Sequence, residues 1–397
     1  MMQQAYIIAA KRTAIGKANR GQFKYTRPDD LLINVIQAAL AEVPNLDSKQ
    51  IDDIVIGNAF PEAEQGFNIA RMAAQLAGLP EQVPGLTINR WCSSGLNAIQ
   101  IAADRIRLGE ADIMIAGGVE SMSRVPMIGN TQSMNPKIFE DDHVNMAYGM
   151  GITAENVASD FNISREDQDT FALESHRRAI QAIQNGTFKK QISPMKVINR
   201  IPDLAEAGRL TTIETLADTD EGPRADTTLE ALAKLRPVFK MGGSVTAGNS
   251  SQTSDGAAVV ILVSEKMLEK LGIKPLARYC TFSVKGVAPE VMGIGPKEAI
   301  PAACQQVGIS QNELQWIELN EAFAAQALAV IRDLDLDPEK TNPTGGAIAL
   351  GHPLGGTGTI LTTRLIHGMR YQGKTGYGMV SMCIGGGMGA AGIFEIL

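Results

Sequence analysis

The chain has 397 residues, a length that suits two or more packed domains rather than one simple core. Charged residues make up 20% and the formal net charge is −7, so no basic excess predicts nucleic acid as a partner. No apolar run reaches the roughly 20 residues that span a bilayer, and neither end reads as a secretory signal or a peroxisomal address. Four widely spaced cysteines without such a signal predict reduced thiols and a cytoplasmic protein.

Apolar strands alternate with helices in the first third of the chain. The expected elements are strands at residues 6–10, 54–57, 86–89 and 113–118, and helices at 31–41, 67–77 and 94–108. This alternation predicts an α/β fold with buried parallel strands.

The middle of the chain, from about residue 121 to 250, has a different composition and hydrophobic pattern. Met, Asn, Asp, Pro and Arg are frequent there, and strand-like runs are few. Ser164 to Asp167 is typical of a capped helix start, and the helix is expected to continue to Ile183. We interpret this section as an inserted, largely helical and loop region, after which a strand resumes at 259–263.

The last third repeats the first in outline. Its expected elements are helices at 296–307, 322–331 and 358–369, and strands at 316–319 and 378–382. In each third an apolar strand runs into a cysteine, Cys92 or Cys383, followed by small residues and an expected helix. The pattern predicts two similar α/β halves.

Two glycine motifs resemble nucleotide-binding loops but lie in the wrong context. Residues 368–375 fit GxxxxGK[ST], yet a helix precedes them and a strand follows, which reverses the order of a phosphate loop. Residues 387–392 fit GxGxxG after a strand, but only five residues remain for the rest of a dinucleotide fold. Neither motif therefore predicts a nucleotide site.

Cys92 and Cys383 are the candidate reactive groups. Cys92 is expected between a strand and a helix, where the helix N-terminus would stabilise a thiolate and lower its pKa. Taken alone, a buried structural cysteine is an equally good reading. Cys383 precedes three consecutive glycines. Glycines cost conformational entropy on folding, and a run of three is expected where backbone N–H groups must approach a ligand closely. Two such cysteines favour chemistry over packing.

His352 and Asn320 are the candidate partners of these cysteines. His352 lies in a glycine-dense loop before a helix, which suits a base or an oxyanion donor. The other histidines, His143, His176 and His367, lack such surroundings and read as surface or packing residues. Asn320 follows a strand, where helix capping is the more common role and orientation of water or histidine the alternative. Cysteine and histidine spacing does not predict a metal site.

Together these segments resemble the thiolase family over nearly the whole chain. The matching pieces, in chain order, are Ala9–Gly16, Cys92–Gly95, Met150–Val157, Thr246–Ser251, Asn320–Phe323, Gly351–Pro353 and Cys383–Gly389. The resemblance implies a five-layered αβαβα fold with two similar halves and an inserted loop domain that holds coenzyme A. The implied division is an N-terminal half of residues 1–121 plus 251–273, a loop domain of 122–250 and a C-terminal half of 274–397.

The resemblance also implies a role for each site residue. Cys92 would be the nucleophile, activated by His352, and Cys383 the general acid and base. Asn320, through a water, and His352 would form one oxyanion site, and the N–H groups of Cys92 and Gly385 the other. The pantetheine-lining residues would be Met150, Phe239, Ser251 and Phe323. Coenzyme A would be a substrate, with no tightly bound cofactor or metal.

Within that family, the sequence favours a degradative 3-ketoacyl-CoA thiolase of fatty-acid β-oxidation. Ser93 stands in place of glycine, and no histidine precedes Met150, unlike many acetoacetyl-CoA enzymes; Gly356 is expected to widen the pocket. The resemblance implies a homodimer or homotetramer, with a hydratase/dehydrogenase subunit as a further possible partner.

Three other readings stay open at this point. The first is a biosynthetic acetyl-CoA C-acetyltransferase. The second is a decarboxylating condensing enzyme, which the second cysteine, Cys383, disfavours. The third is a non-catalytic carrier on the same fold, which the presence of Cys92, His352 and Cys383 disfavours.

Overall fold

The computed structural model describes residues 3–203, 205–206 and 208–397, without the side chains of residues 141–143. Within this part of the chain, ten strands join in one sheet and two more form a separate hairpin. None of the described helices is both long and apolar enough to cross a membrane.

The N-terminal half-sheet has the strand order β4-β3-β5-β8-β1, and the short β2 pairs with β8. Its elements are β1 (Ala5–Arg12), β2 (Gly16–Lys17), β3 (Asp53–Gly57), β4 (Gly85–Ile88), β5 (Ile113–Ser121) and β8 (Ser254–Ser264), with helices α1 (Pro28–Ala41), α2 (Ile69–Leu76), α3 (Ser94–Arg107) and α7 (Glu265–Leu271). Strands β3, β4 and β5 run parallel, whereas β8 is antiparallel to β5 and β1. Every residue of β5 and β8 is buried, which is why both read as nearly continuous runs of apolar or small residues.

The C-terminal half-sheet repeats this plan in the order β10-β11-β12-β9. Its elements are β9 (Ala277–Gly286), β10 (Trp316–Leu319), β11 (Gly376–Ile384) and β12 (Met388–Ile396), with helices α8 (Gly295–Val307), α9 (Ala324–Asp333), α10 (Ala347–Leu350) and α11 (Leu354–Tyr371). Strands β10 and β11 are parallel, and β12 is antiparallel to β11 and β9. A parallel bridge from Ile317 to Thr341 takes the place that β4 has in the first half. Two similar halves are therefore confirmed.

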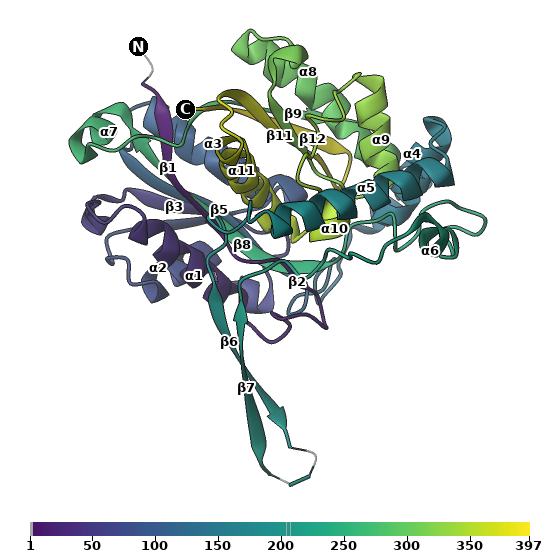
Figure 1. The fold of residues 1–397 in the computed structure, drawn as a ribbon, viewed down its shortest axis with the longest axis horizontal. Coiled ribbons are helices and arrows are strands. Elements are labelled where there is room, and N and C mark those ends of the chain that lie inside the picture. Colours follow the sequence, from purple (N-terminus) through teal and green to yellow (C-terminus); the bar gives the residue numbers. More distant parts are fainter. Residues whose placement is uncertain (1–2, 204, 207) are drawn as a thin grey trace.

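The halves stack as five layers. Helices α3 and α11 contact each other and strands of both half-sheets, so they form the central layer (Figure 1). Helices α1 and α2 cover the outer face of the first half-sheet, and α8 covers that of the second. Strand β1 also pairs with β9 at Tyr6 and Ile7, which joins the two half-sheets.

The middle of the chain contains both helices and an arm. Its elements are α4 (Met150–Asp160), α5 (Arg165–Gln184), β6 (Met195–Pro202), β7 (Leu210–Ala217) and α6 (Leu229–Ala233). The capped start of α5 is confirmed, since Ser164 and Asp167 form a capping box. Strands β6 and β7 form an antiparallel hairpin that projects from the molecule, which the expectation of helix and loop missed (Figure 1). Most of β7 is exposed, so the hairpin lacks the buried face that makes a strand visible in a sequence.

Short 3-10 helices lie between the elements named above. They are η1 (Ser48–Gln50), η2 (Ala63–Gln65), η3 (Trp91–Ser93), η4 (Pro136–Phe139), η5 (Asp141–Ala147), η6 (Pro289–Ile294) and η7 (Gln311–Glu313).

The structure corrects one part of the expected repeat. Cys92 does precede a helix, but Cys383 lies within β11, and the chain then turns back into β12. Gly386 and Gly387 have φ of 76° and 85°, a left-handed conformation that makes this tight turn instead of starting a helix. The counterpart of Cys92 and α3 in the second half is therefore His352, which follows the bridge at Thr341 and precedes α11.

Candidate active site

Cys92 lies in η3, between the end of β4 and the start of α3. This short helix contacts both α11 and β11, so the nucleophile candidate sits where the two halves meet. The cysteine packs against a small apolar cluster that includes Leu354, in the first turn of α11. A Cβ on Gly95 would lie 2.8 Å from the carbonyl oxygen of Gly355, so the glycine lets the starts of α3 and α11 approach closely.

Burial raises the pKa of the Cys92 thiol to about 11, although the backbone N–H groups of Gly385 and of Cys92 itself act to lower it. The expectation of a lowered pKa was therefore wrong, because desolvation outweighs the local dipoles. The two N–H groups still face the sulfur, as the implied oxyanion site requires. Cys92 is a neutral thiol in this state and needs a base before it can attack.

Cys383 is fully buried near the end of β11. Burial raises the pKa of its thiol above the ordinary value, and the charge of a Cys92 thiolate would raise it further. Strand β11 also contacts η3, so the two cysteines lie on neighbouring elements. A proton on Cys383 is therefore strongly held, which suits a group that must first donate a proton and then recover it.

His352 is 5% exposed and sits between two hydroxyl groups. Its backbone N–H donates to Ser254 Oγ at 3.1 Å, and its Nδ1 lies 2.6 Å from Thr357 Oγ1. Thr357 Oγ1 donates its single hydrogen to the carbonyl oxygen of Pro353 at 3.0 Å, so it accepts from Nδ1–H. His352 therefore carries its proton on Nδ1 and a lone pair on Nε2. Burial lowers its pKa to about 4, which keeps the ring neutral at physiological pH.

Asn320 meets that lone pair. Its Nδ2 lies 3.4 Å from His352 Nε2, and its Oδ1 is buried and has no hydrogen-bond partner among the described residues. Helix α9 begins only at Ala324, so the capping role that seemed more common for Asn320 is wrong. The unpaired amide oxygen can accept a hydrogen bond from a water, and that water can donate its second hydrogen to a substrate oxygen.

The four residues expected to line the pantetheine also come together. Met150, at the start of α4, and Phe323 pack in one apolar cluster with Cys383. The rings of Phe239 and Phe323 meet edge to face with centroids 6.0 Å apart. Ser251 donates its backbone N–H to the carbonyl oxygen of Ala322 at 2.9 Å, which places it beside Phe323. An apolar wall therefore leads to Cys383.

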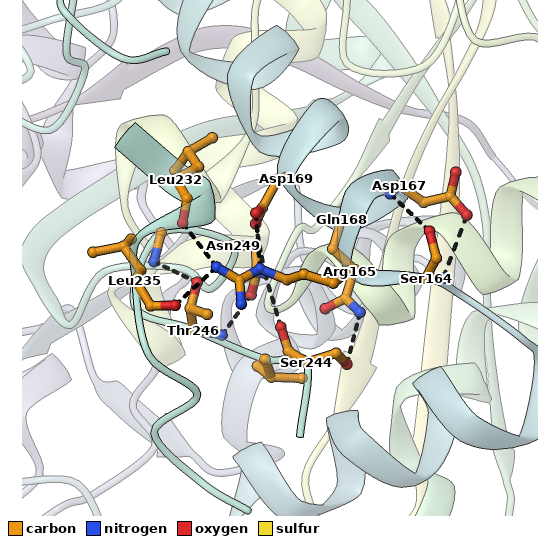
Figure 2. Close-up of polar contacts among 12 residues, drawn as sticks. Ser164, Arg165, Asp167, Gln168, Asp169, Leu232, Leu235, Ser244, Thr246 and Asn249 are labelled. Atoms are coloured by element: carbon orange, nitrogen blue, oxygen red, sulfur yellow. Dashed lines mark hydrogen bonds and ion pairs between the residues drawn. The ribbon is translucent and has the colours of Figure 1, made fainter. Parts of the chain in front are cut away.

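A buried polar network fixes the segment that carries Phe239 and Ser251 (Figure 2). Asn249 Nδ2 donates to Asp169 Oδ1 at 2.9 Å, and Asn249 Oδ1 accepts from the Thr246 N–H at 2.8 Å. Arg165 Nε donates to Asp169 Oδ2 at 2.8 Å and its Nη2 holds two carbonyl groups just before Phe239. The start of α5 therefore positions this wall of the site.

Gly356 does not widen the pocket, contrary to expectation. A Cβ at this position would lie 3.1 Å from the carbonyl oxygen of Gly256 and 3.3 Å from that of Gly118. The residue faces the backbone of β8 and β5, so its missing side chain allows α11 to pack closely on the sheet.

Two of the remaining histidines, His176 and His367, do not enter the site. His176 is buried and its Nδ1 accepts from the Arg224 N–H at 3.1 Å, while His367 Nε2 donates to the carbonyl oxygen of Ala10 at 2.9 Å. Both are packing residues, as predicted, whereas the side chain of His143 lies outside the described residues. In the described part of the chain, no cluster of three or more His, Cys, Asp or Glu side chains could hold a metal ion.

Two supporting residues were missed from the sequence. Thr357, five positions after His352, sets the histidine tautomer. The sequence offered one sign of this role: a hydroxyl residue in the first turn of the glycine-rich helix that follows the histidine. Glu120 Oε2 accepts from the N–H groups of Ala59 and Gly355, both at 2.8 Å, and so ties the end of β3 to the start of α11. Burial raises the pKa of Glu120, and nothing local in the sequence indicates this contact.

Comparison with known proteins agrees with this geometry. Residues 5–266 match the family model "Thiolase, N-terminal domain", and residues 273–396 match "Thiolase, C-terminal domain". The chain belongs to the thiolase family.

Full-length relatives and solved structures of this family lie close to the chain. The 3-ketoacyl-CoA thiolase of Bacillus subtilis is 49% identical over 395 residues and covers 100% of both chains. The crystal structure of the Bacillus anthracis acetyl-CoA acetyltransferase is 40% identical with a TM-score of 0.88, covering 100% of this chain and 99% of the other. Human mitochondrial 3-ketoacyl-CoA thiolase in complex with CoA is 38% identical with a TM-score of 0.87, covering 100% and 98%.

Proposed function

We propose that this thiolase cleaves 3-ketoacyl-CoA with CoA to give acetyl-CoA and a shortened acyl-CoA. The observation that carries the proposal is the position of η3, which carries Cys92: it contacts β11, which carries Cys383, and α11, which begins two residues after His352, the partner of Asn320. Full-length relatives named 3-ketoacyl-CoA thiolase at 45–49% identity support this reading.

The first half-reaction forms an acyl-enzyme. His352 Nε2 takes the proton of the Cys92 thiol as the sulfur attacks the 3-keto carbon, because both groups start neutral. The N–H groups of Cys92 and Gly385 face that sulfur and hold the oxyanion that forms on the attacked carbon. The bond between carbons 2 and 3 then breaks, its electron pair forms the enolate of acetyl-CoA, and Cys383 protonates carbon 2. The enolate oxygen accepts hydrogen bonds from the protonated Nε2 of His352 and from a water held by Asn320.

The second half-reaction returns the enzyme to its starting state. CoA enters and gives its thiol proton to the Cys383 thiolate. The CoA sulfur attacks the Cys92 thioester, and the N–H groups of Cys92 and Gly385 again hold the oxyanion. The carbon–sulfur bond to Cys92 breaks, the shortened acyl-CoA leaves, and the proton on His352 returns to Cys92. Each proton is thereby balanced without a redox or metal step.

CoA is proposed as a substrate that binds along the apolar wall, not as a tightly bound cofactor. Met150, Phe239, Ser251 and Phe323 are the residues assigned to its pantetheine arm. The clustering of Met150 and Phe323 with Cys383 supports this assignment, and so does a solved relative named as a complex with CoA.

The setting of the enzyme is also a proposal. We assign it to fatty-acid β-oxidation in the cytoplasm, as a homodimer or homotetramer that can join a hydratase/dehydrogenase subunit. Four unpaired cysteines support a reducing compartment. Light scattering after size exclusion tests the assembly, and a monomer at micromolar concentration would contradict it. The division into residues 1–121 plus 251–273, 122–250 and 274–397 stays a prediction.

Comparison of acyl chain lengths tests the proposed function. The assay follows CoA-dependent cleavage of 3-ketoacyl-CoA substrates with four, ten and sixteen carbons. We expect efficient cleavage of the longer substrates. Cleavage of the four-carbon substrate alone would instead support acetoacetyl-CoA metabolism, the activity suggested by the name of the Bacillus anthracis relative. No cleavage of any substrate would contradict the proposal.

A further inference from the structure

The residue before the nucleophile, Trp91, has an unusual conformation. Its φ is 42°, in the left-handed region that bulky residues rarely adopt. Two hydrogen bonds hold it there: its N–H donates to Asn89 Oδ1 at 2.8 Å, and its carbonyl oxygen accepts from Ser94 Oγ at 2.6 Å. A strained backbone that its neighbours maintain in this way is common at functional sites.

The conformation lays the indole against the turn that follows Cys383. A Cβ on Gly385 would lie 3.0 Å from Trp91 Cε3, and a Cβ on Gly386 would lie 2.5 Å from Trp91 Cζ3. The ring therefore rests directly on the backbone of these two glycines. This contact explains why the turn has no side chains at either position.

The same turn supplies the N–H group that faces the Cys92 sulfur. Gly385 donates that group, and Gly386 continues the turn with φ of 76°. Trp91 is covalently attached to Cys92 and packs on the residue pair that contains the donor. Its ring thus adds a packing contact between the segment of the nucleophile and the turn of the donor.

We infer that Trp91 is a positioning residue that clamps the Gly385–Gly387 turn, so that the Gly385 N–H stays aimed at the oxyanion formed on Cys92. The inference rests on the oxyanion role proposed for Gly385. The outer part of the indole is open, since Trp91 is 38% exposed, so a smaller side chain would leave the turn uncovered on that side. A flat ring of similar reach, such as phenylalanine, would keep most of the contact.

Three variants and one control test the clamp. Trp91→Ala removes the ring, Trp91→Phe keeps a flat ring, and Gly386→Ala pushes the turn away from an intact indole. The matched control is Phe67→Ala, because Phe67 is also a bulky residue with a left-handed φ, of 54°, and it is 95% exposed. The readouts are the single-turnover rate of Cys92 acylation, the KM for CoA, and amide hydrogen exchange of a peptide covering residues 384–389.

Loss of one oxyanion donor typically slows turnover by about 10²- to 10³-fold, so partial misplacement by Trp91→Ala should slow acylation about 10- to 100-fold. The KM for CoA should stay within about twofold, because the ring acts on the reacting carbon and not on the pantetheine wall. Exchange of the 384–389 amides should rise in Trp91→Ala and Gly386→Ala. Trp91→Phe should recover most of the acylation rate, and Phe67→Ala should match the wild type.

Unchanged acylation and exchange in Trp91→Ala would overturn the inference. It would also be overturned if Trp91→Phe were as slow as Trp91→Ala, since a clamp needs only a flat ring. If Trp91→Ala does not fold, Trp91→Leu decides instead, because leucine fills part of the space without a flat ring; unchanged acylation and exchange in it would overturn the inference. Amide exchange needs no substrate, so it tests the packing of Trp91 on the turn independently of activity. If the wild type fails to cleave 3-ketoacyl-CoA, the proposed function is contradicted, and the exchange data still show whether Trp91 clamps the turn.

Discussion

Replacement of Thr357 by valine should impair the base without changing the shape of the site. Valine has nearly the size of threonine but cannot accept the hydrogen bond from His352 Nδ1–H, which is 2.6 Å long in the native protein. The ring is buried, so this donor would be left without its partner. An unsatisfied buried donor costs about 1–3 kcal/mol, and that energy would shift the tautomer away from the form with the Nε2 lone pair. Such a shift lowers the active population about 5- to 150-fold.

The assay is the pre-steady-state rate of Cys92 acylation by a 3-ketoacyl-CoA. Thr357→Ser is the matched control, because it keeps the hydroxyl that accepts from Nδ1 and donates to the Pro353 carbonyl oxygen. We expect the valine variant to lose about one to two orders of magnitude and the serine variant to stay close to the wild type. A valine variant of normal rate would show that Thr357 does not set the tautomer of His352. Equal losses in both variants would contradict that role as well, because they would point to packing of the threonine methyl group.

Three further predictions concern the acid/base cysteine, the histidine and the pantetheine wall. Cys383→Ala should still acylate slowly at Cys92 from an acyl-CoA but fail to make or break the carbon–carbon bond; normal thiolysis of a 3-ketoacyl-CoA would disprove the acid/base role. His352, with its pKa lowered to about 4 by burial, should remain neutral as the pH falls from 8 to 5, which NMR of labelled histidines can follow. A titration of His352 near pH 6.5 would contradict the derived state. Asn249→Ala should lower the free energy of unfolding by about 1–3 kcal/mol, measured by urea denaturation, and should raise the KM for CoA. An unchanged KM would show that the network around Asn249 does not position the CoA-binding wall.

Local patterns predicted the elements whose signals lie within a few residues of the chain. Cys92 was placed between a strand and a helix because an apolar run ends before it and helical spacing follows it. The start of α5 was predicted because Ser164 and Asp167 form a capping box that is readable in the sequence. Each of these features depends on contacts within one or two turns.

Tertiary contacts explain the failures. Strand β12 begins in a glycine-rich stretch whose GxGxxG spacing hid its pairing with β11 and β9. A helix was expected after Cys383, but Gly386 and Gly387 reverse the chain into β12 instead. Only the fold shows this reversal. The pKa of Cys92 was predicted in the wrong direction because the helix N-terminus is a local feature, whereas desolvation comes from packing of both halves.

The site residues that could be predicted from the sequence are those whose side chains are chemically reactive. Cys92, His352 and Cys383 stood out because thiols and imidazole in small-residue surroundings are unusual. Met292, which packs beside Cys383, has no such signal, because any apolar residue of similar size could fill that place.

The most direct test of the account is the location of the acyl group in the trapped intermediate. Incubation with a 3-ketoacyl-CoA in the absence of free CoA, followed by acid quench and peptide mass mapping, should place one acyl group on the peptide that contains Cys92. The adduct should be lost on addition of CoA and absent from a folded Cys92→Ser variant, since a hydroxyl is a far weaker nucleophile at neutral pH. An adduct on Cys383 instead, or normal turnover by the serine variant, would contradict the assignment of Cys92 as the nucleophile.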